Sequence, residues 1–303
     1  MPNYIPLPEK FTHHRELVGL VANAGVPAPA RWTELNTALD AYLNLDNTAA
    51  DRLAHAVVNP TETTDLTVLR ALALSELNAG PQQLAQLNAV VVAQIEAGMH
   101  DAWAEVARDN YLKVAEQYNG AAAEFTTAAQ AADVEADAAA MVAAEEPARQ
   151  AWLNAVIAAS RLTELVKPLV AAAQLAGTRL DAADEAVAQA WWDAPIHKAA
   201  LFGLLVDAGE VHRRRAWEAF EREGGRTGRW GALVAAGARI RAVALEDFAP
   251  YRQPRPLIHR QQQILGAPMG TVENITIDPE DDDKPNPLPP IDPKRRPSRL
   301  TAV

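Results

Sequence analysis

Apolar side chains between residues 152 and 190 recur at steps that alternate between three and four. This alternation is the a/d pattern of a coiled-coil helix, in which one narrow apolar stripe packs against a second helix. We call this stripe the heptad seam. Many of its members are alanines, which allow close contact between helices. The larger members of the heptad seam are Trp152, Leu162, Val166, Leu169, Leu180 and Val187.

The heptad seam belongs to a longer stretch, residues 81–192, that contains few helix-breaking residues. Its main interruptions are Asn119-Gly120, Pro147, Pro168 and Gly177. In the first part of the stretch, apolar residues advance mostly in steps of four. We therefore predict two long helices that pair as an antiparallel coiled-coil hairpin. The turn is expected at Asn119-Gly120 or at Glu145-Glu146-Pro147, and the sequence leaves both positions open.

The first 80 residues predict an extended arm followed by short helices. Residues 1–10 contain three prolines, which suit an extended arm. Residues 11–80 have helix-period apolar positions and predict a small helical bundle. Its helices are expected at residues 12–24, 31–44, 48–58 and 63–79, with Gly25, Pro27, Gly80 and Pro81 as stop signals.

Short helices return after the long stretch and give way to an extended tail. Residues 193–248 predict a basic helical module, with helices at 194–206, 209–223 and 229–246. Residues 249–303 predict an extended, proline-rich tail with one strand at 271–277, TVENITI. A single strand must obtain a partner from elsewhere. We therefore expect this strand and the tail to take their partners from neighbouring subunits.

Composition makes the fold class mainly α. Alanine, the strongest helix former, accounts for 63 of the 303 residues. The absence of cysteine excludes disulfides and thiolate metal sites. Apolar runs are short and broken by charge, so we expect no membrane span, and the first ten residues do not have the pattern of a signal peptide.

The net charge of −11 is distributed unevenly along the chain. Residues 1–196 sum to −14, residues 197–260 to +5, and residues 261–303 to −2. An acidic body therefore carries a basic module.

The basic module contains the strongest candidate for binding a charged partner, HRRRAWEAFEREGGRTGRW at residues 212–230. Its arginines could clamp phosphates while Trp217 or Trp230 stacks on bases. Alternatively, they pair with nearby glutamates or with an acidic protein surface, and we favour a protein partner over nucleic acid. Partner contacts are also expected at Trp192 and at the basic end of the tail. The predicted partner-binding residues are Arg213, Arg214, Arg215, Arg222, Arg226, Arg229, Trp192, Lys294, Arg295, Arg296 and Arg299.

No catalytic or cofactor pattern stands out. The glycine-rich GGRTGRWG follows a predicted helix and lacks the Lys-Ser or Lys-Thr of a phosphate loop, so we interpret it as a flexible joint. The histidines show no metal-ligand spacing, and the three serines lack the context of a nucleophile. We therefore predict a protein that is not an enzyme, with no cofactor, metal or small-molecule substrate.

Two other classes fit parts of the sequence. A DNA-binding regulator would explain the arginines, but Leu205 and Arg215 fit a helix-turn-helix poorly. A secreted actinobacterial helical hairpin would explain the Tyr42 and Asp46 spacing. However, Trp32-Thr33-Glu34 is not the W-x-G turn of that class.

The overall organisation resembles minor structural proteins of long-tailed phages that infect actinobacteria. The features that carry the resemblance are the PNYIPLPEKF arm, the alanine-rich coiled coil, the arginine-rich module and the DDDKPNPLPP tail. An excess of arginine over lysine, 22 against 6, is typical of a GC-rich genome. The resemblance implies a virion location and a tail-tip role without catalysis, among other virion proteins and copies of itself. A head or portal-associated protein that contacts DNA is the alternative.

Overall fold

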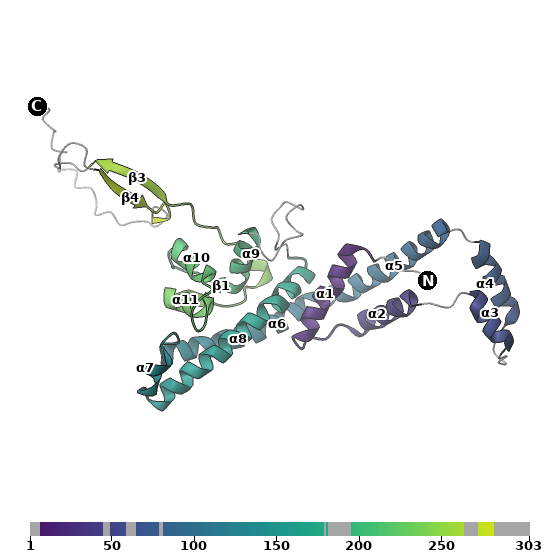
Figure 1. Cartoon of the computed structure of the whole chain (residues 1–303), viewed down its shortest axis with the longest axis horizontal. Coiled ribbons are helices and arrows are strands. Elements are labelled where there is room, and N and C mark those ends of the chain that lie inside the picture. Colours follow the sequence, from purple (N-terminus) through teal and green to yellow (C-terminus); the bar gives the residue numbers. More distant parts are fainter. Residues whose placement is uncertain are drawn as a thin grey trace, which may run out of the picture.

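Two long antiparallel helices form the axis of the molecule, α6 (Ala107–Ala131) and α8 (Glu146–Leu175) (Figure 1). We describe a computed structural model for residues 7–44, 49–58, 65–78, 81–178, 180, 195–263 and 272–281. The predicted mainly α fold is confirmed. Of the extended arm predicted at residues 1–10, residues 1–6 lie outside the described residues, and the prediction is wrong at residues 9 and 10, where the first helix already begins. The predictions for Trp192 and for the basic residues of the tail also lie outside the described residues.

The connection between α6 and α8 spans residues 132–145 and contains the short helix α7 (Ala138–Val142). Asp137 caps α7 by accepting a hydrogen bond from the Ala140 N–H at 2.8 Å. Of the two predicted turn positions, Asn119-Gly120 is wrong because it lies inside α6. Both flanking residues, Tyr118 and Ala121, are fully buried, so packing keeps this part of the chain helical.

The heptad seam packs against α6 over most of α8. Leu162 and Leu169 are fully buried, and Val166 is half-buried against the same core. Trp152 is half-buried near the start of α8 and donates its indole N–H to the Ala136 carbonyl at 2.9 Å. The coiled-coil pairing between residues 152 and 173 is therefore confirmed.

The seam helix is shorter than predicted, because α8 ends at Leu175 and not near residue 192. Gly177 has a φ of 84°, and the Thr178 N–H bonds to the Ala173 carbonyl at 3.0 Å. Both features are typical of a Schellman stop, in which glycine adopts the left-handed conformation. Leu180 is buried beyond the helix end, and Val187 lies outside the described residues.

The four N-terminal helices form close to the predicted positions but do not assemble into one bundle. They are α1 (Glu9–Asn23), α2 (Ala30–Leu43), α3 (Ala49–Val58) and α4 (Leu66–Asn78). Instead, α1 packs on α8, α2 packs on α5 (Pro81–Ala104), and α3 packs on α4. Phe11, Val18 and Val21 bury the apolar face of α1 in the common core. The contacts between α1 and α2 include the hydrogen bonds of Arg15 with Asp40 and of Trp32 with His14.

The basic module docks on the side of α6 and α8. It contains α9 (Pro195–Leu205), α10 (Arg213–Glu221), α11 (Arg229–Ala236), the short antiparallel pair β1 (Val206–Asp207) and β2 (Arg239–Ile240), and the 3-10 turn η2 (Leu245–Asp247). Tyr118 donates to the Leu205 carbonyl at 3.3 Å, and the Trp230 indole donates to Thr163 at 2.9 Å. The helix predicted at 229–246 ends at residue 236, because Gly237, with a φ of 91°, terminates it.

The predicted strand of the tail exists as β4 (Val272–Ile277), but its expected partner is wrong. It pairs within the chain with β3 (Ile258–Gln263), antiparallel, with Ile258 opposite Ile277. The sequence of β3, IHRQQQ, lacks the apolar alternation by which a strand is predicted. The hairpin extends away from the helices (Figure 1).

The helices should lose stability in weak acid because of His14. Its ring is buried, accepts from the Trp32 indole at 3.3 Å and lies 4.0 Å from the His100 ring. Burial, helped by the charges of His100 and His13, lowers the pKa of His14 from 6.5 to about 4. Since the unfolded chain then binds the proton first, stability is present above pH 6.5 and is lost as the pH falls toward 4.

We therefore expect the free energy of unfolding, measured with urea at pH 7 and at pH 5, to fall more in the native chain than in His14→Gln. His259→Gln is the matched control because His259 is exposed on β3. An equal fall in the native chain and in His14→Gln would contradict this account.

Candidate functional site

Arginines and carboxylates from two distant parts of the sequence meet at the base of the β3–β4 hairpin. We call this group the clasp. Its basic residues lie at the start of α10 and in the segment before β3, and its acidic residues directly follow β4. The members of the clasp are Arg213, Arg214, Arg252, Arg255, Asp278 and Glu280. Arg213 and Arg214 lie in the first turn of α10, where a positive charge interacts unfavourably with the helix dipole. The carboxylates of the clasp compensate this unfavourable interaction.

Glu280 is the centre of the clasp. Its side chain is fully buried. One carboxylate oxygen accepts from Arg213 and from Arg252, each at 2.7 Å, and the other accepts from the backbone N–H and the Nε of Arg255 at 2.7 and 3.1 Å. Burial alone would raise the pKa of Glu280, but the bonds from Arg255 and the charges of Arg252 and Arg255 lower it below its ordinary value. Glu280 is therefore ionised and paired in the interior.

Asp278 makes a two-pronged pair with Arg214. The Nε and Nη2 of Arg214 donate to its two oxygens at 2.5 and 2.8 Å, and Arg214 Nη2 also reaches the Arg255 carbonyl at 2.5 Å. The hydrogen bonds from Arg214, with the backbone N–H of Glu280, lower the pKa of Asp278 to about 2. This geometry fixes the direction of the chain as it leaves β4.

Tyr251 anchors the segment that enters β3. Its ring stacks on Phe202 with centroids 3.9 Å apart, and its hydroxyl donates to the Arg213 carbonyl at 3.3 Å. Gly203 lies beneath the same segment, where a Cβ would come within 2.1 Å of the Ala249 carbonyl oxygen. The segment that enters β3 and the segment that leaves β4 are thus both fixed to the basic module.

His212 lies beside the clasp and raises the question of a metal. A ring nitrogen of His212 and one oxygen each of Asp278 and Asp281 lie within 4.8 Å of one another. However, Arg214 already donates to both oxygens of Asp278, and its positive charge opposes a cation. We interpret the group as an ion-pair cluster in which His212 approaches Asp281 at 3.0 Å.

The predicted arginine cluster is dispersed. Arg213 and Arg214 belong to the clasp, and the guanidinium of Arg229 lies over the Phe220 ring at 4.9 Å. Arg215 and Arg222 are exposed on α10 and at its end. The cluster therefore does not present one continuous cationic surface.

Arg226 lies in the glycine-rich loop GGRTGRWG. The sequence predicts a flexible joint here, but the loop makes several contacts with the rest of the chain. The guanidinium of Arg226 lies 3.3 Å from the centre of the Trp152 ring and donates to the Trp152 carbonyl at 2.6 Å. Glu135 accepts from the backbone N–H groups of Arg226 and Thr227 at 2.7 and 2.9 Å, and from the Thr227 hydroxyl. The loop is thereby attached to the connection between α6 and α8.

The β3–β4 hairpin itself is largely exposed. Ile258 and Ile277, opposite each other at its base, are each 38% exposed, and Leu257 is 39% exposed. No other described strand pairs with β3 or β4, so the outer edge of each strand is available for hydrogen bonding. An isolated two-stranded hairpin is only marginally stable, and here the clasp holds its base.

Sequence reasoning missed Arg252, Arg255, Asp278 and Glu280 as site residues. From the sequence, these segments are assigned to an extended tail, and the partners of the tail are expected to lie in neighbouring subunits. The available signal was the nearby basic segment YRQPRP, which complements DPED in charge.

Comparison with protein-family models, with curated proteins and with solved structures found no match. Among the described helices, none combines the length and the apolar character that a bilayer crossing requires.

Substitution Glu280→Gln should release the β3–β4 hairpin without unfolding the helices. Three arginines would then surround a neutral group, and the charge-assisted bonds would be lost. We expect faster hydrogen exchange at the amides of residues 258–263 and 272–277 and unchanged exchange in α6 and α8. Asp281→Asn is the matched control, because the Asp281 side chain is 72% exposed and should leave exchange in the hairpin nearly unchanged. Unaltered exchange in Glu280→Gln would contradict the clasp.

Proposed function

We propose that this chain is a structural subunit without catalytic activity that bridges neighbouring subunits in a tailed-phage virion, as a minor tail protein. The observation that carries the proposal is the clasp, which fixes a hairpin with two available strand edges onto a helical body. A fixed hairpin of this kind suits strand addition by a neighbouring chain, because the backbone groups are already aligned.

The arrangement of the elements supports a bridging role. The α3–α4 pair lies at one end of the molecule, the β3–β4 hairpin lies at the other, and α5, α6 and α8 span the distance between them (Figure 1). A subunit that joins two neighbours requires this separation of contact surfaces along a stiff support.

The clasp also supports a protein partner over nucleic acid. Arg213 and Arg214 already donate to Glu280 and Asp278, so binding a phosphate would require breaking partly buried ion pairs. A DNA contact in a head or portal-associated protein remains the second candidate, because Arg215 and Arg222 are exposed.

The proposal is tested in the virus whose genome encodes the chain. We expect mass spectrometry to detect the native chain in purified particles. A variant that lacks residues 258–281 should keep its helical circular dichroism but be missing from particles, because the bridging element is gone. A variant with Lys198→Ala is the control, since Lys198 pairs only at the surface, with Glu221 at 3.2 Å. Absence of the native chain from particles would refute a virion role, and normal incorporation of the deletion variant would refute the bridging role of the hairpin.

Binding to duplex DNA separates the two candidates. If the clasp occupies the arginines, the full chain should bind weakly and lose binding as salt rises through the physiological range. Fluorescence anisotropy with a labelled duplex measures this. Binding that is tight at physiological salt, and that Arg215→Ala with Arg222→Ala abolishes, would favour the DNA-contacting candidate.

A further inference from the structure

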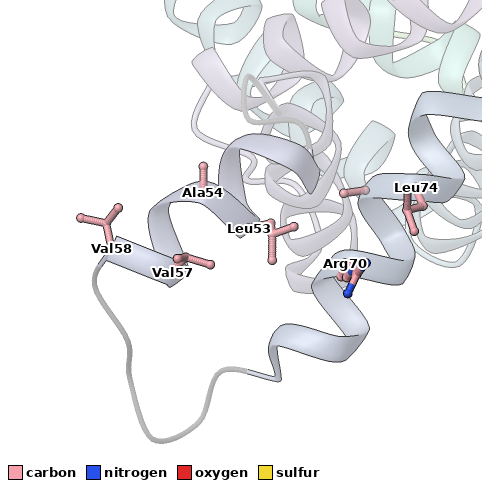
Figure 2. A pocket seen from close by; sticks show the side chains of 7 residues that line it. Leu53, Ala54, Val57, Val58, Arg70 and Leu74 are labelled. Carbon is pink, nitrogen blue, oxygen red and sulfur yellow. The ribbon is translucent and has the colours of Figure 1, made fainter.

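The α3–α4 pair carries an open apolar groove at the end of the molecule far from the clasp. The groove has a volume of about 590 Å³. Its lining residues are Leu53, Ala54, Val57, Val58, Arg70, Ala73 and Leu74. Figure 2 shows Val57 and Val58 near the end of α3, and Arg70 and Leu74 on the facing side of α4. The groove is thus formed by both helices.

The two helices leave most of their apolar surface in water. Val57, Val58 and Leu74 on the groove are 60%, 76% and 53% exposed, and Val68 and Leu72 on α4 are 52% and 47% exposed. Among the described residues of α3 and α4, only the alanines Ala56 and Ala73 are buried. Alanine buries little apolar area, so contact between these two helices alone gives little stabilisation. An exposed apolar area of this size marks an interaction surface.

The charge of the α3–α4 pair favours a second copy as the occupant. The pair carries two acidic residues, Asp51 and Glu76, and two basic residues, Arg52 and Arg70. Asp65, which accepts from backbone N–H groups at the start of α4, brings the sum for the described residues 49–58 and 65–78 to −1, whereas residues 1–196 as a whole sum to −14. Two copies that approach through α3 and α4 therefore repel each other less than two that approach through the rest of this acidic region.

We propose that α3 and α4 of two copies pack together as a four-helix bundle and make the chain a dimer. Each copy supplies half of the bundle, and the apolar side chains that one pair exposes become the core of the whole. In a twofold arrangement the same face is used by both copies, so a mainly apolar face, with Arg70 as the one charged side chain of its lining, complements itself. Leu87 and Val90 of α5 are also more than half exposed and enlarge the apolar surface of this part of the chain.

This inference does not depend on the proposed function, because it concerns the purified chain. It assigns a partner to the α3–α4 end of the molecule, which lies far from the clasp. A helix from a different protein is the competing occupant, and it predicts a monomer in the absence of that protein.

The experiment uses sedimentation of the full chain. We expect a dimer that dissociates on dilution, and a shift to monomer in Val57→Lys. Lysine is chosen because Val57 lies in the last turn of α3, where a positive charge suits the helix dipole and preserves the fold. Val142→Lys is the matched control, since Val142 is 78% exposed on α7, far from the groove, and should leave the dimer intact.

The absence of cysteine permits a second measurement. In Val57→Cys each copy carries a single thiol, and a long-armed bismaleimide, which does not need the short Cα–Cα distance of a disulfide, should link two copies, whereas Val142→Cys should link them several-fold less. A native chain that is monomeric at every concentration, or equal linkage in the two cysteine variants, overturns the proposal. A monomer that nevertheless enters particles would refute this dimer and leave the bridging function standing.

Discussion

Close packing between α6 and α8 is the interaction on which the rest of the molecule depends. Alanines fill much of this contact, with Ala121, Ala155 and Ala173 fully buried. Small side chains bring the helices near each other, and the larger Leu162 and Leu169 fill the space that remains. Other elements pack against this helix pair. The helix α1 packs on α8, and the basic module is held by hydrogen bonds that involve Tyr118 and Trp230.

Polar contacts position the smaller elements on this helix pair. Glu135 holds the glycine-rich loop by its backbone N–H groups, and Glu280 gathers three arginines at the base of the hairpin. Neither contact adds much net stability, because burial costs Glu280 desolvation energy and solvent screens the exposed Glu135. These contacts instead fix the orientation of the loop and of the hairpin, because a carboxylate that accepts several hydrogen bonds permits few alternative arrangements of its donors. Among the described residues, the contacts that orient the hairpin therefore lie at its base.

The two ends of the molecule present different surfaces. The α3–α4 pair exposes neutral apolar side chains, which suit a copy of itself. The β3–β4 hairpin exposes polar strands with available backbone groups, which suit an extended segment of another chain. A dimer at one end and strand addition at the other would give an assembly unit with two hairpins.

The sequence by itself determined that the chain is mainly helical, the heptad seam between residues 152 and 173, and the existence of a strand at 272–277, because each depends on local propensity and periodicity. Tertiary structure decided how far some helices extend and what each element contacts. Asn119-Gly120 stays helical because its neighbours are buried, and α1 packs on α8 instead of joining a bundle of the four N-terminal helices. Arg213 and Glu280 meet although 67 positions separate them. Such pairing depends on how the chain folds back, and no local pattern specifies it.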